Sequence, residues 1–485
     1  MEKTKTMLVA GLVAFATFLW LLPSVGKAQA PSVPLPPNDS ASSEAPDVTR
    51  RVNCDAGETI QQAVDNSNNG DTVLVSGTCD ENVTVGDGRT RVTLDGQGTA
   101  TINGPDAGVD TVDIRGRGIT IRGFTISGGR DGIRIFRGGT AAAIDGNSIQ
   151  GTGRNGVNVF RSSSASITNN TIQNLITGIT LNESGTASIS NNTIQNITGR
   201  GIQLNNGSSA SITSTIVQNA GSDGISFTSS NGTVDLCSIQ TNAVNGIVIQ
   251  VSGGVSITRS TISGNGQRGI QVGIGGSARI GTNSSQTNGN IISGNQNDGV
   301  NIGNATAFLG GNTISNNGRY GVGLNMATAS LFGGNTITNN ATSGITAQAS
   351  GVILGDPGAS PNTNTISGNG VAPIPGSGIA GGIYLLSGTT LTARNATISG
   401  NTGNGLTVQS RSVANFFSPS TVDNNTGDGI QLTLGGALVS ASNVTASGNG
   451  GFGLQCTDGE SSFQGSTAGI SGNTAGDVSV TCTGF

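Results

Sequence analysis

The stretch ITNNTIQNLITGITLNESGTASI, residues 167–189, decides the fold. It contains three short segments in which Ile or Leu alternates with Thr, Asn or Ser, the pattern of a strand with one buried face. Asn and Gly residues separate the segments and favour tight turns. We therefore expect three short strands that form one triangular coil of a parallel β-helix. Each strand would pair with its copy in the coils on either side.

The same pattern returns along the chain at a nearly fixed interval. A phrase of the Gly-Ile-x-Leu type recurs mostly every 22 to 24 residues, a period typical of solenoids. It begins at Gly132, Gly156, Gly178, Gly201, Gly224, Gly246, Gly269, Gly299, Gly321, Gly344, Gly382, Gly405, Gly429 and Gly451. The repetition predicts one elongated all-β body rather than several globular domains. At about 4.8 Å per coil, about sixteen coils would extend over about 75 Å.

Asparagine recurs at the turn that follows the Asn-Thr-Ile phrase of each repeat. An inward Asn can donate a hydrogen bond to its copy in one neighbouring coil and accept one from the other, so we expect a buried ladder. The residues concerned are Asn265, Asn295, Asn317, Asn340, Asn369 and Asn401. Cys237 stands where other repeats carry Asn170, Asn192 and Ser214, which predicts a buried thiol rather than a nucleophile.

The N-terminal residues have the composition of an export signal. Residues 1–30 combine Lys3 and Lys5, an apolar run and the small-residue sequence Ala28-Gln29-Ala30, as in a cleaved secretory signal peptide. An uncleaved membrane anchor is the alternative. Residues 31–50 are Pro/Ser-rich and predict a flexible linker. We expect a protein that is secreted or held at the cell surface or in the periplasm, with no membrane span once the signal is cleaved.

Composition limits the possible partners and chemistry. The chain has 485 residues, a formal net charge of −5, and no histidine. Lysine occurs only at Lys3, Lys5 and Lys27, so cleavage of residues 1–30 would remove every lysine side chain. A mildly acidic body without a basic stripe gives no reason to expect nucleic acid binding. We expect a monomer whose cationic side chains are all arginines.

The cysteines form two local pairs at the ends of the repeats. In an exported protein, Cys54 with Cys79 and Cys456 with Cys482 are expected to form disulfides. The end coils of a solenoid lack a neighbour, so both disulfides would act as staples there. The spacing does not suggest a zinc site.

The regular repeats are preceded and followed by less regular segments. We expect an N-terminal cap with the first coils at residues 51–128, regular repeats at 129–455, and a final coil with its disulfide at 456–485. Residues 58–67, ETIQQAVDNS, place Ile60, Ala63 and Val64 on one side of a helix. Such a helix would cover the open end of the apolar core.

These motifs resemble those of a known superfamily. The segment ETIQQAVDNSNNGDTVLV, the phrase ITIRGFTI and the Asn-Thr-Ile/Gly-Ile coils look like the right-handed parallel β-helix proteins of the pectate-lyase-like superfamily, from about residue 52 to 485. The resemblance implies a right-handed, single-stranded parallel β-helix. It does not imply one activity, because the superfamily includes lyases, hydrolases, esterases, epimerases and non-catalytic surface proteins.

Several chemistries of the superfamily lack their motifs here. The His and Lys of polygalacturonase-like sites are missing, Asp356-Pro357 is not followed by the His-Asp of mannuronan epimerases, and no pectin-esterase phrase occurs. A pectate-lyase-like mechanism, with Ca²⁺ held by carboxylates and an arginine as base, remains an alternative. Its carboxylates would come from residues scattered over different coils: Asp110, Asp113, Asp131, Asp145, Glu183, Asp223, Asp235 and Asp298. We expect no other cofactor.

The early coils carry the most distinctive side chains. GGRDGIRIFR at 128–137 and GRNGVNVFR at 153–161 are successive coils, so like residues should stack: Arg130 near Arg154, Phe136 near Phe160, and Arg137 near Arg161. Stacked cations need an anion or carboxylate to offset their repulsion. One interpretation is a groove for an acidic sugar, which Arg130, Asp131, Arg134, Phe136, Arg137, Arg154, Phe160, Arg161 and Glu183 would bind. The other is a solvated arginine face with both phenylalanines under a corner loop.

The sequence therefore favours a non-catalytic module that binds a polysaccharide or another cell-surface component, or that serves as an adhesive or structural module. The alternative lyase would use Arg134, Arg137 or Arg161 as its base. A third possibility is ice binding, because Thr precedes the Asn-Thr-Ile isoleucine in many coils and Ser or Thr often follows it. Longer turns at 281–290, 355–364 and 370–380 could form a rim for a binding face or be tolerated insertions.

Overall fold

The computed structural model describes residues 47–282, 289–356, 363–372 and 379–484. The segment predicted as signal peptide, nearly all of the predicted linker and most of the three longer turns lie outside these ranges. The described residues form a parallel β-helix with about 23 residues per turn and about 18 turns. The number of turns exceeds the expected sixteen because coils at both ends lack the Gly-Ile-x-Leu phrase, which runs only from Gly132 to Gly451. None of the described helices is long and apolar enough to cross a membrane.

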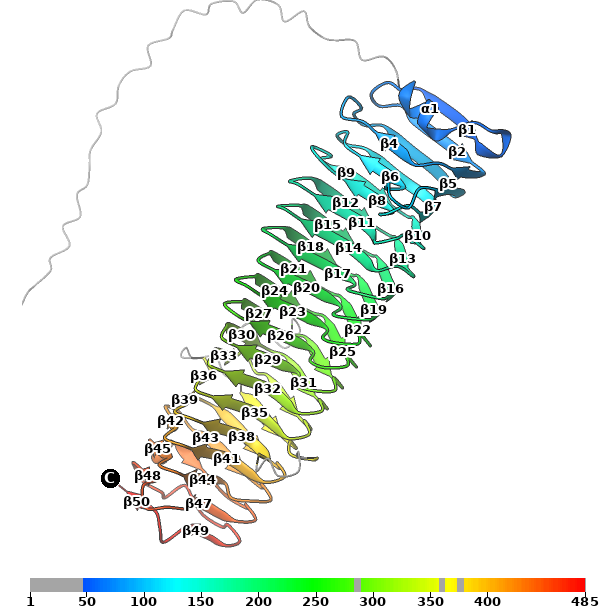
Figure 1. Cartoon of the computed structure of the whole chain (residues 1–485). Helices are drawn as coiled ribbons and strands as arrows, with labels where there is room; N and C mark the ends of the chain where they lie inside the picture. The colour runs from blue at the N-terminus through cyan, green and yellow to red at the C-terminus, as the bar shows by residue number, and fades with distance from the viewer. Residues whose placement is uncertain (1–46, 283–288, 357–362, 373–378, 485) are drawn as a thin grey trace, which may run out of the picture. The chain divides into compact units, whose positions relative to one another are not determined.

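One coil illustrates how the sequence folds. Strands β12 (Ser164–Thr168), β13 (Thr171–Gln173) and β14 (Thr177–Asn182) follow one another and pair in parallel with β15, β16 and β17 of the next coil (Figure 1). Register partners carry the same type of side chain, as in Ile167 with Ile189 and Ile172 with Ile194. These isoleucines are fully buried, so each column of the coil stacks its own row of core residues.

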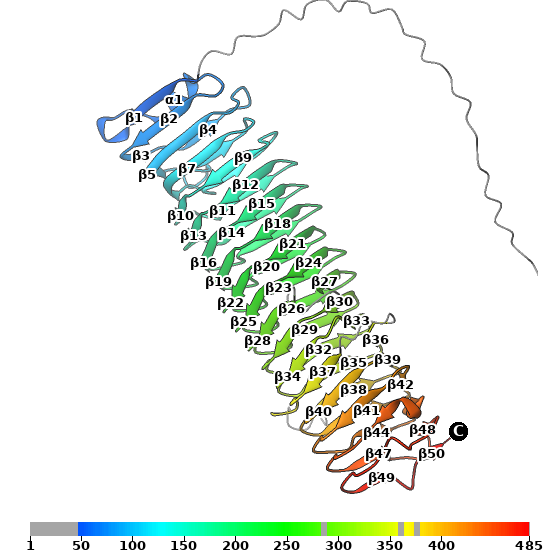
Figure 2. The same ribbon diagram turned by 180° about the vertical axis from the view of Figure 1, so that it is seen from behind.

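The strands form three columns, which Figure 2 shows from behind. The first column contains β4 (Val83–Val85), β6 (Val112–Ile114), β8 (Ile133–Ile135), β11 (Asn155–Phe160), β14, β17 (Ile202–Asn205), β20 (Ile225–Thr228), β23 (Ile247–Gln250), β26 (Ile270–Gly273), β29 (Val300–Gly303), β32 (Tyr320–Asn325), β35 (Ser343–Gln348), β38 (Gly381–Leu386), β41 (Asn404–Gln409), β44 (Ile430–Thr433), β47 (Phe452–Cys456) and β49 (Gly476–Val478).

The second column follows the first along each coil. It contains β1 (Thr49–Asn53), β2 (Thr72–Ser76), β9 (Ala142–Asp145), β12, β15 (Thr186–Ser190), β18 (Ser209–Thr213), β21 (Asn231–Asp235), β24 (Gly254–Thr258), β27 (Ser277–Gly281), β30 (Thr306–Gly310), β33 (Thr328–Phe332), β36 (Gly351–Leu354), β39 (Thr390–Ala393), β42 (Val413–Phe416), β45 (Ala437–Val439), β48 (Ser462–Phe463) and β50 (Thr483–Gly484).

The third column closes each coil. It contains β3 (Thr78–Asp80), β10 (Ser148–Gln150), β13, β16 (Thr193–Ile197), β19 (Ile216–Ala220), β22 (Ser238–Gln240), β25 (Thr261–Ser263), β28 (Ile291–Ser293), β31 (Thr313–Ser315), β34 (Thr336–Thr338), β37 (Asn364–Ser367), β40 (Ala396–Ser399), β43 (Ser420–Asp423) and β46 (Val444–Thr445). The long strands β5 (Thr93–Gly104) and β7 (Thr120–Gly128) each cross the second and third columns.

The predicted N-terminal helix is present but shorter than the sequence suggested. The helix α1 spans Ile60–Asp65, with Ile60 and Val64 buried against β1, β2 and β4. Glu81 of the next coil accepts hydrogen bonds from the backbone amides of Ile60 and Gln61, at 2.6 and 3.0 Å. Two short 3₁₀ helices, Cys54–Ala56 and Ala441–Asn443, complete the described helices. A capping role for so short a helix stays a prediction.

The predicted asparagine ladder runs through the later coils. The side-chain amide of Asn295 donates to Asn317 at 2.9 Å, and that of Asn317 donates to Asn340 at 2.9 Å. The chain of bonds continues in both directions through Asn242, Asn265, Asn369, Asn401, Asn425, Asn449 and Asn473.

A second column of inward polar side chains precedes the third strand of each coil. It includes Asn170, Asn192, Thr215, Cys237 and Ser260. The residue at this position in the repeat before Cys237 is therefore Thr215. The expectation of Ser214 was off by one residue, because Ser214 occupies the exposed corner with φ 49°.

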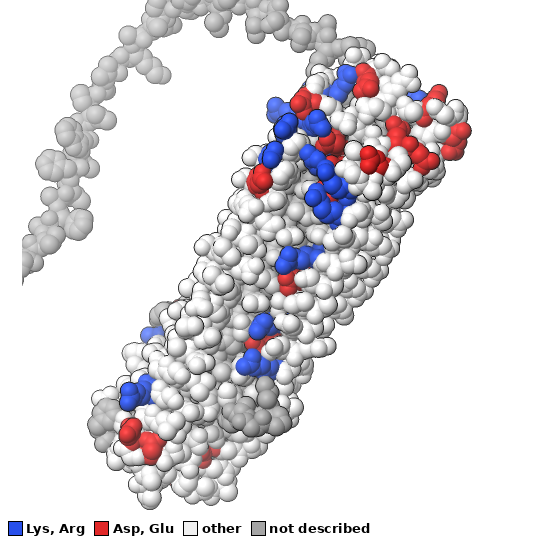
Figure 3. All heavy atoms as spheres, viewed as in Figure 1, with Lys and Arg blue, Asp and Glu red and all other residues white. Residues whose placement is uncertain are grey.

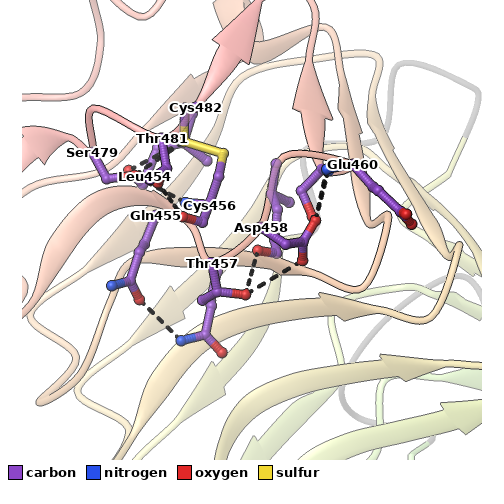
Figure 4. The surroundings of a disulfide bond; sticks show 12 residues. Leu454, Gln455, Cys456, Thr457, Asp458, Glu460, Ser479, Thr481 and Cys482 are labelled. Atoms are coloured by element: carbon purple, nitrogen blue, oxygen red, sulfur yellow. Dashed lines mark hydrogen bonds between the residues drawn. A yellow bond between two sulfur atoms is a disulfide. The ribbon is translucent and has the colours of Figure 1, made fainter.

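Both expected disulfides are formed. Cys54 bonds to Cys79 and Cys456 bonds to Cys482, while Cys237 is a free, buried thiol. Figure 4 shows the second disulfide, which joins β47 to the turn containing Thr481, whose hydroxyl donates to the Cys456 carbonyl. Disulfides persist in oxidising compartments, so the pair indicates a location outside the cytoplasm.

Candidate functional site

The candidate site is built on the outer face of the first column. Arg134 of β8, Asn158 of β11 and Thr180 of β14 are register partners in three successive coils. Their side chains point outward because each lies between two residues whose side chains are fully buried in the core, as Asn158 lies between Val157 and Val159.

Two arginines share one buried carboxylate at the N-terminal side of the site. The guanidinium of Arg130 donates twice to Asp110, at 3.0 and 2.8 Å, and Arg134 donates to the same carboxylate at 2.9 Å. The Nε of Arg134 lies 3.9 Å from Asp113 and has no hydrogen-bond partner. The sequence suggests Asp110 as a possible Ca²⁺ ligand, whereas the structure shows it as the hydrogen-bond partner of Arg130 and Arg134 in the next coil.

The carboxylate of Asp131 is hydrogen-bonded to three side chains of the next coil. It accepts two hydrogen bonds from Arg154, at 3.0 and 2.8 Å, and one each from the side chains of Asn155 and Asn158, at 2.7 and 2.8 Å. Burial would raise the pKa of Asp131, but the hydrogen bonds from Arg154 and Asn158 outweigh burial and hold its pKa below the ordinary range. Asp131 therefore stays ionised and holds Arg154 in place.

The two phenylalanines stack as the repeat predicts. The rings of Phe136 and Phe160 are 5.6 Å apart and nearly parallel, with an interplanar angle of 13°. The guanidinium carbon of Arg134 lies 4.0 Å from the Phe136 ring centre, and those of Arg137 and Arg161 lie at 5.0 and 5.3 Å. Phe136 is buried beneath these cations, whereas Phe160 is partly exposed.

Glu183 pairs with Arg161 at the corner beside the strands. The two groups are 3.1 Å apart and about half exposed, so the pair adds little stability. Arg137, Arg161 and Glu183 all have left-handed backbone conformations at this corner. The structure thus brings together Arg130, Asp131, Arg134, Arg154 and Phe160, and places Phe136, Arg137, Arg161 and Glu183 at their edge.

The outward side chains enclose an open pocket of about 520 Å³. It is lined by Arg130, Arg134, Arg154, Asn155, Asn158, Phe160, Thr177, Thr180, Asn182, Gln203 and Asn205. Figure 3 shows the basic atoms gathered on this face near β8 and β11. Sequence reasoning missed the amide and hydroxyl lining, although Asn158, Thr180 and Gln203 follow Arg134 in the register and Asn182 follows Phe160.

The predicted acids do not assemble into a cation site in the part of the chain that the structure describes. There, only Cys54, Cys79 and Glu81 form a group of three potential metal ligands within mutual reach, and both cysteines are in a disulfide. Asp131 is fully buried under Arg154, and Glu183 pairs with Arg161 at the exposed corner.

A comparison with protein families agrees with this architecture. The right-handed beta helix region family matches residues 64–186, 110–248, 177–307, 245–355 and 298–475. Similar solved structures include the A-module of the Azotobacter vinelandii mannuronan C-5 epimerase AlgE6, with 17% identity over 68% of this chain and 94% of that chain, at a TM-score of 0.47. The periplasmic alginate epimerase AlgG has 13% identity over 70% and 83%, at 0.41.

The pectate lyase Pel9A is more distant, with 13% identity over 60% of this chain and 78% of that chain, at a TM-score of 0.31. No curated protein sequence matches the chain. Identities this low assign no activity. The overlapping family matches extend from residue 64 to 475, and the chain belongs to the family of right-handed β-helix proteins.

Proposed function

We propose that the pocket on the first column binds an acidic polysaccharide, without catalysis, at the cell surface or outside the cell. The observation that supports the proposal is the arrangement of charge at the pocket, with cations toward the solvent and their anionic partners buried. The guanidinium groups of Arg130, Arg134 and Arg154 face the pocket, while their carboxylate partners Asp110 and Asp131 are 3% and 0% exposed. A ligand would therefore meet cations, amides and the Phe160 ring.

Each part of the lining suits a part of a uronate sugar. A guanidinium can bind a carboxylate through two parallel hydrogen bonds. The amides and hydroxyls of Asn158, Thr180 and Gln203 can bond to sugar hydroxyls, and an exposed ring edge or face such as that of Phe160 can pack against a pyranose. The buried carboxylates fix the arginines before the ligand arrives, which lowers the entropic cost of binding.

Binding is tested by affinity electrophoresis of residues 31–485 through gels that contain polygalacturonate, alginate or neutral dextran. We expect retardation by the acidic polymers, and a loss of about tenfold in affinity in Arg154→Gln, since one charge-assisted contact contributes about 1.5 kcal/mol. Arg259→Gln is a matched control, because Arg259 pairs with Asp235 on the turn after the second column. Equal retardation of Arg154→Gln and the wild type would contradict the proposed site.

The calcium-assisted lyase is an alternative outcome of this test, although the acids among the described residues form no carboxylate cluster that could hold Ca²⁺. Its signature is growth in ultraviolet absorbance from unsaturated products when polymer and Ca²⁺ are added. Growth that Arg134→Ala abolishes, with Arg134→Lys retaining part of the rate, would replace the binding module by an enzyme. Retardation without absorbance growth favours the binding module.

A second candidate function rests on the third column. Thr313, Thr336, Thr365 and Thr397 are register partners in successive coils, and each is followed two residues later by Ser or Thr. Such a row can order water, although Thr is also favoured on any solvated strand. Thermal hysteresis that is lost in Thr365→Tyr but retained in Arg154→Gln would establish ice binding. The absence of hysteresis in the wild type would remove this candidate.

A further inference from the structure

The layering of carboxylates under arginines continues along the first column well beyond the pocket. Arg200 pairs with Asp223, and their side chains are 38% and 9% exposed. Five coils after Arg154 in the register, Arg268 begins another cluster around Asp298, whose side chain is fully buried. Figure 3 shows basic atoms recurring at intervals along the face that carries β8 to β32.

In the cluster at Asp298, the arginines are less fully hydrogen-bonded to their carboxylate than Arg130 and Arg154 are to theirs. Arg268 and Arg319 approach the Asp298 carboxylate from the coils on either side, with their Nε atoms 3.9 and 4.0 Å from its oxygens. Both Nε atoms are buried and have no hydrogen-bond partner, while Asp298 accepts from Asn301 at 2.8 Å. Burial raises the pKa of Asp298, although both arginines lower it. One carboxylate thus faces two guanidinium groups, which leaves an excess positive charge.

An aromatic ring lies beside this cluster, as in the pocket. The guanidinium carbon of Arg319 lies 4.1 Å from the ring centre of Tyr320 and its Nη2 donates to the Tyr320 hydroxyl at 3.0 Å. Gly323 occupies the outward strand position beside the cluster, where a Cβ would lie 3.2 Å from atoms of both Tyr320 and Asp298. A cation pair beside an aromatic ring therefore occurs twice on the same face.

Between the two clusters the outward strand positions carry no charge. Gln203 and Gln271 occupy those of β17 and β26, and the nearly buried Ser226 and Val248 occupy those of β20 and β23. From β8 to β32 the column makes eight pairing steps. At about 4.8 Å per step, the basic groups are distributed over about 38 Å along the solenoid axis.

We infer that the ligand is a linear polyanion that lies along the axis, seated in the pocket and held again by Arg200 and by the pair Arg268 and Arg319. The inference rests on the proposed function and extends it from a pocket to a track. A chain that reaches both clusters gains the second contact at a high effective concentration, whereas a short anion occupies only the pocket. Acidic oligomers that cannot span the clusters would therefore bind more weakly than the polymer.

The test compares digalacturonate with polygalacturonate by calorimetry on residues 31–485. The main variant is Arg268→Gln/Asp298→Asn/Arg319→Gln, which removes the buried carboxylate together with its two cations and so leaves no unpaired buried charge. We expect digalacturonate affinity within about twofold of the wild type, and polygalacturonate affinity reduced about tenfold or more, because two exposed cation contacts at about 0.7 kcal/mol each are lost. The dependence of polymer affinity on salt should also become less steep.

Two further variants help to distinguish a ligand that is confined to the pocket from one that lies along the whole track. Arg200→Gln tests the middle of the track without touching either cluster, and Arg259→Gln controls for the change in charge. Wild-type affinity for the polymer in the triple variant and in Arg200→Gln, with loss in Arg154→Gln, would confine the ligand to the pocket and overturn the track. Failure of the wild type to bind both ligands would overturn the proposed function and the track together.

Discussion

At the residue scale, Asp131 shows how burial and hydrogen bonding compete. Its carboxylate is fully buried, yet four side-chain hydrogen bonds keep it ionised and fix Arg154 above it. Removing one partner of such a group exposes the full cost of burying the remaining charge. The pair of Arg161 and Glu183 is about half exposed, so solvent screens the attraction between its charges. Removing one partner of this pair should therefore have little effect on stability.

Asp131 should make folding stability depend on acid pH. Its pKa is lowered in the folded protein, so its stabilising contribution is present above the unfolded pKa of about 3.9 and is lost as pH falls through the folded pKa. We expect the urea midpoint of the wild type to exceed that of Asp131→Asn near pH 6, and the gap to shrink below about pH 3.5. Glu183→Gln, which alters an exposed pair, should show little gap at either pH. A gap for Asp131→Asn that does not change with pH would contradict this account.

Cys237 should be chemically inert while the protein is folded. Burial raises the pKa of its thiol to about 11, and the thiol lies in the core beside the Ile212 and Asp235 carbonyls. Since the thiolate is the reactive form, iodoacetamide at about pH 8 should leave the native protein unmodified and label one cysteine in urea. Intact-mass spectrometry measures the label. Rapid labelling of the native protein would show that the coil around Cys237 opens.

At the element scale, the inward amides make each coil depend on its neighbours. The side chain of Asn317 donates to the Ile292 carbonyl in the coil before it and to Asn340 in the coil after it, and it accepts from the backbone and side-chain amides of Asn295. An apolar residue would fill the volume but would leave those backbone groups unpaired. The ladder therefore explains why one residue type recurs over so many coils.

Asn317→Ala should be strongly destabilising for a single side-chain truncation. It removes the acceptor for the backbone and side-chain amides of Asn295 and the donor to the Ile292 carbonyl. We expect a loss of about 2–4 kcal/mol, from two or three buried groups that lose their partners. Urea unfolding followed by circular dichroism measures the change.

The neighbouring Asn316 provides the control, since it is exposed and has φ 55°. Glycine tolerates this conformation, so Asn316→Gly should change stability by less than about 0.5 kcal/mol. Similar losses in Asn317→Ala and Asn316→Gly would show that the ladder contributes no more than a surface turn.

At the scale of the whole molecule, the described strands pair with strands of the adjacent coils and with no others. Stability therefore depends on the coils themselves and on their nearest neighbours. Terminal coils have one neighbour instead of two. The two disulfides, one near each end of the described stack, link residues 25 and 26 positions apart in the end coils.

Removing the Cys456–Cys482 disulfide should loosen one end and leave the middle intact. For a loop of this length, replacement of both cysteines by serine should cost about 3 kcal/mol. We expect faster amide hydrogen exchange in β47 and β49 and unchanged exchange in β11 and β14, because coupling decays from coil to coil. Faster exchange throughout the stack would instead mean that the coils unfold as one unit.

The repeat made the fold and part of the site predictable. A fixed period places like residues in adjacent coils, so the stack of Phe136 on Phe160 and the proximity of Arg137 to Arg161 could be inferred without coordinates. The same reasoning chose Ser214 instead of Thr215, because this coil is shifted by one residue and its inward strand residue is Val217 rather than Ile216. It also left the carboxylate partners of the arginines unassigned.

The sequence by itself determined the β-helix, its period and the asparagine ladder, because each depends on residues that recur at a fixed spacing. It also determined the two disulfide pairs, because each pair of cysteines lies about one coil apart at one end of the repeats. Only the tertiary structure decided that Asp110 and Asp131 lie under Arg130 and Arg154, and that Asp298 lies between Arg268 and Arg319. The physical reason is that these acids lie in turns, where the direction and burial of a side chain depend on packing against the adjacent coil.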